Sequence, residues 1–437
     1  MIYSPVFEML KKYTFQNAER YHMPGHKGEG VLFDGVGADL VKMDVTELDF
    51  TDNILNPQHA FLEAQDLMTK RCKSIKSFFL SGGSTQGNHT MIMSSLKEGD
   101  KILVDRFCHI SVLSALALSG ALPVFIENEY ADKCGVLGCV SEENLKKAVA
   151  ENSDAKAVFI TSPNSYGQVA PLRKISKICE ENKMLLLVDE AHGAHFPFSD
   201  MLPESAIEQG ADASVVSYHK TIPSLTQCAV LNVGNHSLLK KAEETLHMLI
   251  TSSSSFLLMA SIDYGRAYME EVGKEKMERL IKIIRKNAPK NVLKTDDPMR
   301  IVVRCDGEKS LEILRKEKIE PEMYGNGTMV FIVTAADSEE KVTRLLEILG
   351  RLPETDFEAE KIPHGELKLT PREAYYAEST LCNIDKALGK ISKKAIYAYP
   401  PGVAAVLPGS IIDENAINFI KNNNLIGKQD NKIEVIK

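Results

Sequence analysis

Short runs of apolar residues in the central part of the chain predict a sheet of buried strands. Several of these runs are apolar at consecutive positions, and they are rich in β-branched residues. Strands of this kind are buried on both faces, as in a mainly parallel sheet that helices cover on each side. Seven strands are predicted, at 77–80, 101–105, 122–126, 156–161, 184–189, 212–217 and 228–233.

Stretches with a helical pattern lie between the predicted strands, at 85–97, 141–152 and 172–182. Strands that alternate with helices build βαβ units, so the sequence predicts an α/β fold. The chain has 437 residues, of which 44% are hydrophobic. It is therefore long enough to bury a large core in two or three domains.

After about residue 255 the pattern of predicted helices and strands changes. A long helical run covers 256–287, and it is followed by apolar runs at 300–305 and 329–334. These runs alternate with helical patterns around 308–318 and 338–351, which predicts a smaller α+β domain.

The chain is thus expected to have three parts. These are an amino-terminal arm at 1–30, a large domain at 31–272 and a small carboxy-terminal α+β domain at 273–437. Near its end, the Pro/Gly-rich stretch 399–409 is expected to be irregular, because proline is excluded from helix interiors and central strands.

Composition argues against several classes of protein. The formal net charge of −8 disfavours nucleic-acid binding, which needs a basic surface. The eight cysteines are scattered without a C-x-x-C pair, as is typical of reduced thiols in a reducing compartment. The first 22 residues carry charges throughout and have no apolar signal core. A cytoplasmic protein is expected.

The segment 107–126 has no Asp, Glu, Lys or Arg and is about as long as a membrane span. It also contains His109, Gly120 and Pro123, which do not suit a span. We interpret it as a buried helix, a glycine turn and a buried strand, so no membrane segment is expected.

Ser81 to Gly87 form a glycine-rich segment between a predicted strand and a predicted helix. Glycine lets the backbone approach a ligand, and a helix amino terminus offers free N–H groups and a positive dipole end. The hydroxyls of Ser84 and Thr85 add donors, so a phosphate would fit here. A plain turn from strand to helix explains the same residues.

Asp189 follows a buried strand directly, and ligands gather at the carboxyl ends of such strands. The Asp-Glu-Ala-His sequence there also resembles the magnesium-binding strand of ATP-driven helicases. That reading needs a phosphate loop ending in Lys-Ser/Thr. Asn88 and His89 stand at those positions, so nucleotide hydrolysis is disfavoured.

A metal site is a further possibility for the acidic and histidine side chains in this segment. No H-E-x-x-H-type spacing supports such a site, so we expect no metal there. The candidates are Asp189, Glu190, His192 and His195.

Lys220 lies just beyond another predicted buried strand. Lysine is rarely buried, so this side chain either extends to solvent or has a function. Together, a phosphate segment, Asp189 and Lys220 supply the three groups that pyridoxal 5′-phosphate (PLP) requires. These are an anchor for its phosphate, a carboxylate for its pyridine nitrogen and an amine for its aldehyde.

Ten segments, in order and almost end to end, match one family. They are MPGHKG (23–28), DVTELDFTDNI (44–54), SFFLSGGSTQG (77–87), GDKILVDRFCHISV (99–112), TSPNSYG (161–167), VDEAHGAH (188–195), GADASVVSYHKTIPSLTQ (210–227), SSSSFLLMASID (252–263), TPREA (370–374) and YPPGVAAVLPG (399–409). With them the sequence resembles the ornithine/lysine/arginine decarboxylases of fold type I, in the shorter form without an amino-terminal wing domain.

The resemblance implies an aspartate-aminotransferase-like large domain with a mainly parallel seven-stranded sheet. It also implies PLP as cofactor and a homodimer with its sites at the subunit boundary. The implied reaction is decarboxylation of arginine, lysine or ornithine to agmatine or a diamine. Which of the three substrates is preferred stays open.

The resemblance also assigns roles to individual residues. It implies that Lys220 joins the cofactor aldehyde, that Asp189 pairs with the pyridine nitrogen and that His109 stacks on the ring. His219 or Lys220 would return a proton to the α-carbon, and His192 would lie near the phenolic oxygen or the substrate carboxylate. The implied phosphate-binding residues are Gly83, Ser84, Thr85, Ser217 and His219.

Each histidine can also be read as an ordinary core or surface residue, and for His22, His26 and His195 we favour that reading. Some residues depart from the family pattern and bear on substrate identity. They are Phe107, Ile110, Pro171 and Ser410.

Two other functions stay open. An aminotransferase or carbon–sulfur lyase of the same fold would use a carboxy-terminal arginine for the substrate carboxylate. A catalytically silent regulator would bind PLP or a partner protein without turnover. The candidate arginines are Arg300, Arg304, Arg344, Arg351 and Arg372.

Overall fold

The computed structural model describes residues 2–437 except 17–19, 21–22, 25, 29–36, 326 and 400. His22 and the predicted boundary at residue 30 lie outside the described residues.

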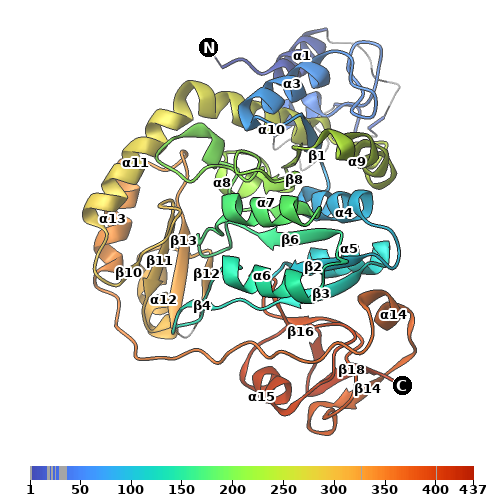
Figure 1. The fold of residues 1–437 in the computed structure, drawn as a ribbon. Coiled ribbons are helices and arrows are strands. Elements are labelled where there is room, and N and C mark those ends of the chain that lie inside the picture. Colours follow the sequence, from blue (N-terminus) through green and yellow to red (C-terminus); the bar gives the residue numbers. More distant parts are fainter. Residues whose placement is uncertain are drawn as a thin grey trace.

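All seven predicted strands form one sheet, in the order β1-β9-β8-β7-β6-β2-β3 (Figure 1). The pairs among β3, β2, β6, β7 and β8 are parallel, whereas β9 runs antiparallel to both of its neighbours. The predicted mainly parallel, seven-stranded sheet is therefore confirmed. Its strands are β1 (Lys76–Leu80), β2 (Lys101–Asp105), β3 (Leu122–Ile126), β6 (Ala157–Thr161), β7 (Leu185–Asp189), β8 (Ala213–Ser217) and β9 (Ala229–Val233).

Helices cover both faces of this sheet. In β2, Ile102 and Val104 pack in a core cluster with α4, α5 and α9, whereas Leu103 packs in another with α6 and α7. Successive side chains of a strand point to opposite faces, so both faces of β2 are buried. These helices are α4 (Gly83–Ser95), α5 (Ile110–Ser119), α6 (Glu142–Glu151), α7 (Leu172–Glu181) and α9 (His236–Leu249).

The apolar segment 107–126 has the predicted form. It contains α5, then Gly120 in the left-handed region at φ 74°, then β3. In the described part of the chain, no helix combines the length and the apolar character needed to cross a membrane.

A further group of helices packs against β1, β8 and β9, and its members share one large core cluster. The predicted helical run at 256–287 is confirmed, with a π-helical turn in its middle. These elements are α1 (Pro5–Phe15), α2 (Ala38–Met43), α3 (Ala60–Cys72), η2 (Phe196–Phe198), α10 (Phe256–Tyr268), η3 (Met269–Gly273) and α11 (Lys274–Asn287).

A second sheet with order β10-β11-β13-β12 is antiparallel throughout. Two helices alternate with its strands, as the sequence predicts for this region. The elements are β10 (Val292–Leu293), β11 (Arg300–Arg304), α12 (Gly307–Lys316), β12 (Met323–Tyr324), β13 (Thr328–Ile332) and α13 (Glu339–Leu349). The bounds of the predicted domains stay predictions.

The carboxy-terminal unit has two sheets of its own, β14-β18-β17 and β15-β16. The prediction that 399–409 is irregular is wrong at 404–406, where β16 pairs with β15. Pro401 and Pro408 flank this strand, so neither interrupts its ladder. The elements are α14 (Pro371–Tyr376), β14 (Ser379–Asn383), η4 (Ile384–Lys386), β15 (Ile396–Tyr397), β16 (Ala404–Val406), α15 (Glu414–Asn422), β17 (Lys428–Gln429) and β18 (Lys432–Ile436).

Arg106 joins the carboxy-terminal unit to the large sheet. Its side chain, 3% exposed, follows β2 and donates to the carbonyls of Pro363 (2.9 Å), Ala404 (2.8 Å) and Ala405 (3.2 Å). The amide of Ile110 also donates to the carbonyl of Gly402, at 3.0 Å. The carboxy-terminal unit is thereby held beside the ends of the parallel strands.

Candidate active site

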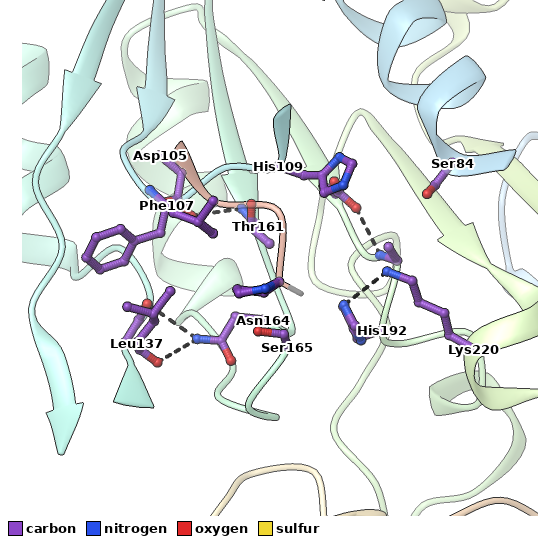
Figure 2. A pocket seen from close by; sticks show the side chains of 15 residues that line it. Ser84, Asp105, Phe107, His109, Leu137, Thr161, Asn164, Ser165, His192 and Lys220 are labelled. Carbon is purple, nitrogen blue, oxygen red and sulfur yellow. Dashed lines mark hydrogen bonds between the residues drawn. The ribbon is translucent and has the colours of Figure 1, made fainter. Parts of the chain in front are cut away.

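The carboxyl ends of β2, β6 and β7 meet at one edge of the sheet, where Asp105, Thr161 and Asp189 end these neighbouring strands. A pocket lies at this edge, and all three residues line it (Figure 2). It contains about 560 Å³ of space not filled by atoms, part of it open to solvent. The predicted site residues that line it are Ser84, His109, Asp189, His192 and Lys220.

Lys220 and His192 point toward one another in this pocket, with Lys220 Nζ 3.1 Å from His192 Nε2 (Figure 2). On the other side of the ring, Arg300 Nη2 lies 2.9 Å from His192 Nδ1. Burial lowers the pKa of Lys220 and, with the charges of Lys220 and Arg300, holds the pKa of His192 well below its usual range. The environment thus favours a neutral imidazole.

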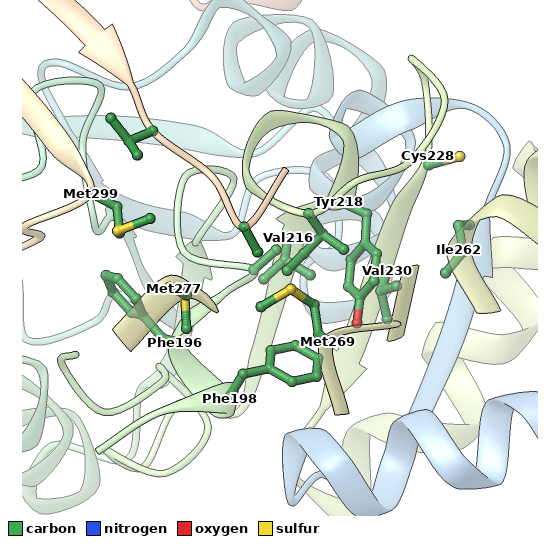
Figure 3. Close-up of a cluster of buried hydrophobic side chains, with 14 of the residues drawn as sticks. Phe196, Phe198, Val216, Tyr218, Cys228, Val230, Ile262, Met269, Met277 and Met299 are labelled. Carbon is green, nitrogen blue, oxygen red and sulfur yellow. The ribbon is translucent and has the colours of Figure 1, made fainter. Parts of the chain in front are cut away.

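Lys220 lies in α8 (Tyr218–Thr221), a short helix that follows β8. Two residues earlier, Tyr218 inserts into the large hydrophobic cluster beside Val216 and Val230 (Figure 3). Its hydroxyl contacts the sulfur of Met68 at 3.0 Å. A packed aromatic side chain on the same short helix therefore fixes the backbone from which Lys220 extends.

Asp189 is 3% exposed, and both of its carboxylate oxygens accept hydrogen bonds. Asn88 Nδ2 donates to Oδ2 at 2.8 Å, and the amide of Ala191 donates to Oδ1 at 3.1 Å. Asn88 Nδ2 also donates to Ser111 Oγ at 2.9 Å, and that hydroxyl lies 2.8 Å from His109 Nδ1. A continuous network therefore joins the carboxylate to the imidazole predicted to stack on the cofactor.

His109 caps the start of α5, where its Nδ1 accepts the amide of Ser111 at 3.2 Å. A nitrogen that accepts this bond carries no proton, so the neutral ring carries its proton on Nε2. Burial lowers the pKa of His109, which favours this neutral form.

The glycine-rich segment opens α4, which begins at Gly83 with φ +69°. The first amides of a helix have no acceptor within the helix, so they are available to an anion. Ser217 Oγ donates to Ser84 Oγ at 2.8 Å, which joins the end of β8 to the first turn of α4. A Cβ at Gly87 would lie 2.3 Å from a Val215 side-chain carbon, so glycine is needed for α4 to pack this closely on β8.

The remaining predicted residues stand around the pocket without lining it. Gly83 and Thr85 belong to the first turn of α4, and the side chain of Thr85 is exposed. Ser217 is fully buried at the end of β8. His219 Nδ1 lies 3.0 Å from the carbonyl of Cys228, and burial lowers the pKa of this histidine.

The other acidic and histidine side chains named in the sequence analysis have separate partners. Glu190 accepts the amide of Ala206 at 2.8 Å, and the buried His195 lies 3.1 Å from Asp297 Oδ1. His26 lies 3.2 Å from Asp44 Oδ2. Among the residues that the structure describes, no group of three His, Cys, Asp or Glu is arranged to hold a metal ion.

The carboxy-terminal unit contributes Pro401 and Val403 to the pocket wall. Between them, Gly402 has φ +84°, and a Cβ on it would lie 2.7 Å from His109 Cδ2. The pocket thus combines segments that are almost 300 residues apart (403 − 109 = 294).

Of the four residues that depart from the family pattern, Phe107 lines the pocket and Ile110 begins α5. Pro171 precedes α7 with an exposed side chain. Ser410 is buried and donates to the carbonyl of Leu407 at 2.8 Å, and it does not line the pocket.

Sequence reasoning missed Asp105, Asn88 and Ser111. Asp105 ends a predicted buried strand as Asp189 does, so the same signal was available for it. Burial raises the pKa of Asp105 to about 6, and its carboxylate accepts three hydrogen bonds, from Phe107 N, Asn128 Nδ2 and Thr161 N. No comparable signal marked Asn88 or Ser111, which lie inside predicted helices.

The polar groups in this pocket fit PLP. It offers an amine (Lys220), a buried carboxylate (Asp189) and, at Ser84, a helix amino terminus with a hydroxyl. Thr161 lines the pocket, and its buried Oγ1 has no hydrogen-bond partner within the described residues, so this hydroxyl remains available to a ligand.

Comparison with known protein families agrees with this geometry. The model for the major domain of Orn/Lys/Arg decarboxylases matches residues 4–304, and the model for their C-terminal domain matches residues 356–430. The chain belongs to the Orn/Lys/Arg decarboxylase family.

Several known proteins match this chain along nearly their whole length. The arginine decarboxylase of Bacillus anthracis is 32% identical, and the alignment covers 96% of this chain and 93% of that protein. The arginine decarboxylase of Bacillus subtilis is 30% identical with the same coverage.

Solved structures confirm the fold type of this family member. The lysine decarboxylase of Francisella novicida superimposes with a TM-score of 0.86 at 18% identity, covering all of this chain and 81% of that one. The serine palmitoyltransferase of Sphingomonas wittichii gives a TM-score of 0.54 at 18% identity, covering 68% and 77%. At these identities the comparison shows the fold alone, which is the predicted fold of type-I PLP enzymes.

Proposed function

We propose that this protein is a PLP-dependent decarboxylase that converts arginine to agmatine and carbon dioxide. The observation that carries the proposal is Lys220, a partly buried amine that lines the same pocket as Asp189. The family places the chain among decarboxylases of basic amino acids. Arginine is favoured because the relatives that match nearly the whole chain are named arginine decarboxylases.

PLP, when bound, supplies a conjugated ring that accepts the electron pair left on the α-carbon as carbon dioxide departs. Lys220 would hold its aldehyde end, Asp189 its ring nitrogen and His109 its ring face. Ser84 and the first amides of α4 would hold its phosphate, with Gly83, Thr85, Ser217 and His219 supporting that segment from close by.

The protein's own residues prepare this chemistry before any substrate arrives. Asn88 and the amide of Ala191 hold the Asp189 carboxylate in one orientation. Burial of that carboxylate strengthens its electrostatic effect, because the low dielectric of the interior screens charge less than water does. Lys220, with His192 beside its Nζ, is better placed than His219 to return a proton to the α-carbon, because His219 does not line the pocket.

A product assay tests the substrate. The purified protein with PLP is incubated separately with arginine, lysine and ornithine, and carbon dioxide, agmatine, cadaverine and putrescine are measured without an added keto acid. We expect agmatine and carbon dioxide from arginine. Cadaverine or putrescine as the main product would overturn the choice of substrate, and no carbon dioxide from any of them would overturn the reaction.

Arg300 is the one observation that favours an aminotransferase or carbon–sulfur lyase. Of the five candidate arginines it alone reaches this site, whereas Arg304 pairs with Asp132 and Arg344 with Glu317 at the surface. Release of carbon dioxide without a keto acid distinguishes the decarboxylase from an aminotransferase. Bound PLP without turnover of any basic amino acid would indicate a silent regulator.

The role of Lys220 has a direct test. Borohydride reduction of the PLP-loaded protein, followed by peptide mapping, should place the cofactor on the peptide that contains Lys220. Lys220→Ala should lose this attachment and nearly all turnover. Attachment to a different lysine would overturn the assignment of the site.

We also propose that the protein is a cytoplasmic homodimer. The subunit arrangement implied by the family resemblance supports the dimer, and the exposed ring of Tyr399 lies close to the pocket-lining Pro401 in the chain. Sedimentation of the PLP-loaded protein should give twice the chain mass of 48.4 kDa.

A further inference from the structure

Three side chains from separate parts of the fold form a line of hydrogen bonds that ends at Lys220. Arg300 comes from β11 in the second sheet, His192 from the loop after β7, and Lys220 from α8. Arg300 Nη2 lies 2.9 Å from His192 Nδ1, and His192 Nε2 lies 3.1 Å from Lys220 Nζ. Arg300 is only 1% exposed, so its position is determined by the protein around it.

The chemistry of these groups determines where the protons lie. A guanidinium has only donors, so His192 Nδ1 must accept from Arg300 and carries no proton. A neutral imidazole has one proton, which is therefore on Nε2 and faces Lys220 Nζ. An ammonium group cannot accept a hydrogen bond, so Lys220 completes the line only as a neutral amine.

We propose that Arg300 is a positioning residue that, through His192, holds Lys220 as a neutral amine before PLP binds. The inference rests on the proposed function, because an amine that joins an aldehyde must offer a free electron pair. It assigns Arg300 a role on the lysine side of the pocket, where the guanidinium acts through the imidazole of His192.

The charges around the line agree with this arrangement. Burial lowers the pKa of Lys220, and the charge of Arg300 lowers it further, whereas Asp189 and Glu322 act in the opposite direction. With Lys220 neutral, a protonated His192 would be a second cation in contact with Arg300, near the rings of His109 and His219. Burying another charge without a carboxylate partner is costly, so the neutral ring is preferred.

The line also has a structural consequence. Gly167 has φ +77°, and a Cβ there would lie 2.7 Å from Arg300 Cβ, so the loop after β6 closes directly over this arginine. The amides of Asp296 and Asp297 donate to the carbonyl of Gly167 at 3.1 and 3.0 Å. The loop after β6 thereby fixes the position of Arg300 relative to the first sheet.

The first experiment reads the tautomer of His192 directly in the unaltered protein. Long-range nitrogen–proton NMR of the PLP-free full chain, labelled with ¹⁵N-histidine, distinguishes the two neutral tautomers and the imidazolium. His192→Asn identifies the signal by its loss. We expect a neutral ring protonated at Nε2 from pH 6 to pH 8, and a ring protonated at Nδ1 or at both nitrogens overturns the proposal.

The second experiment measures Lys220 itself. Competitive acetylation of the PLP-free protein over a range of pH, read by mass spectrometry of the Lys220 peptide, gives the midpoint at which this amine becomes reactive. Arg300→Met should move the midpoint upward by about 1 pH unit or more, since it removes both the donor and a nearby like charge. Arg300→Lys, which keeps a donor and the charge, should restore most of the difference.

Arg304→Met is the matched control. Arg304 is on the same strand, four residues further on, and pairs with Asp132 away from the pocket, so its loss should leave the midpoint unchanged. An unchanged midpoint in Arg300→Met, or an equal shift in Arg304→Met, overturns the proposal. Both experiments use the PLP-free protein without amino acid, so absence of decarboxylation would overturn the proposed function while leaving these results intact.

Discussion

The side chain of Asn88 orients the Asp189 carboxylate without adding a charge to the pocket. It stands where a nucleotide-binding loop would need lysine, and its amide instead donates to both Asp189 and Ser111. A lysine ammonium there would attract the Asp189 carboxylate and neutralise it. A neutral amide orients the same carboxylate and leaves its charge for another partner, which we propose is the ring nitrogen of PLP.

Asp189→Asn is expected to keep the attachment of PLP to Lys220 but to slow decarboxylation by roughly 10²–10³-fold, which corresponds to losing about 3–4 kcal/mol of transition-state stabilisation. The amide keeps the shape of the carboxylate but not the charge that keeps the ring nitrogen protonated. Single-turnover release of carbon dioxide and the absorbance of bound PLP measure the two effects separately.

Both oxygens of Asp189 accept hydrogen bonds, so the new amide would also place its NH₂ against a donor. The double variant Asn88→Asp, Asp189→Asn restores a donor–acceptor pair while leaving the amide at position 189. We expect it to recover stability but not rate. Recovery of the rate would mean that hydrogen bonding, and not charge at this position, is what matters.

Two adjacent acidic residues at the end of β7 have different surroundings. Asp189 faces the pocket, whereas Glu190 is buried and accepts the amide of Ala206. This separation follows from the alternation of side chains along an extended chain. An acidic pair at a strand end therefore contributes one carboxylate to the site and one to the interior.

Glu190 should make stability depend on pH. Burial raises the pKa of its carboxyl from 4.5 to about 8. Between these values the folded protein keeps a proton that the unfolded chain has lost, so the free energy of unfolding should fall as the pH rises, on the order of 1 kcal/mol per pH unit. Glu190→Gln removes this titration, so its urea unfolding should vary less between pH 4.5 and pH 8.

The exposed Glu180 on α7 provides the comparison, since Glu180→Gln should leave the pH dependence of wild type unchanged. Parallel curves for wild type and Glu190→Gln would show that the buried carboxyl is not protonated in the folded state.

The segment 401–403 and the start of α5 form a second junction between elements. Gly402→Ala adds a Cβ at φ +84°, 2.7 Å from the ring of His109, so either the ring or the strand must move. We expect weaker retention of PLP together with a strain of about 1–2 kcal/mol. Gly389→Ala has a similar φ of +75° with nothing within 4 Å of the new Cβ, so it should lower stability without releasing PLP.

The carboxy-terminal unit completes the pocket wall with Pro401 and Val403, and the buried Arg106 joins this unit to the large sheet. Arg106→Met should leave three carbonyls without their donor and should destabilise the unit by about 3 kcal/mol or more. Hydrogen exchange read by mass spectrometry should show faster exchange in 395–412.

Arg372 gives a matched comparison for this effect. It also reaches from the carboxy-terminal unit to the large domain, where it donates to the carbonyls of Ala117 and Leu118, but its side chain is 31% exposed. Water can replace these bonds, so Arg372→Met should change exchange in 395–412 much less. Equal effects of the two variants would contradict the view that burial makes Arg106 the main anchor.

The amino-acid sequence alone predicted the seven strands, their mainly parallel arrangement and the acidic residue Asp189 at the end of one of them. Buried parallel strands carry a strong local signal, because both faces must be apolar and the polar residue that follows must lie at the carboxyl edge. Motif order was likewise enough for the family. Each of these signals is local in the sequence, so it can be recognised without knowledge of the fold.

Other features depend on contacts between segments that lie far apart in the sequence. Arg300 was one of five equivalent arginines in the sequence, and its contact with His192 depends on how the second sheet meets the first. Gly402 and His109 are almost 300 residues apart in the sequence, and they come together in the segment just before β16. Contacts of this kind form when separate units pack together. Such packing produces no periodic pattern in the sequence of either segment.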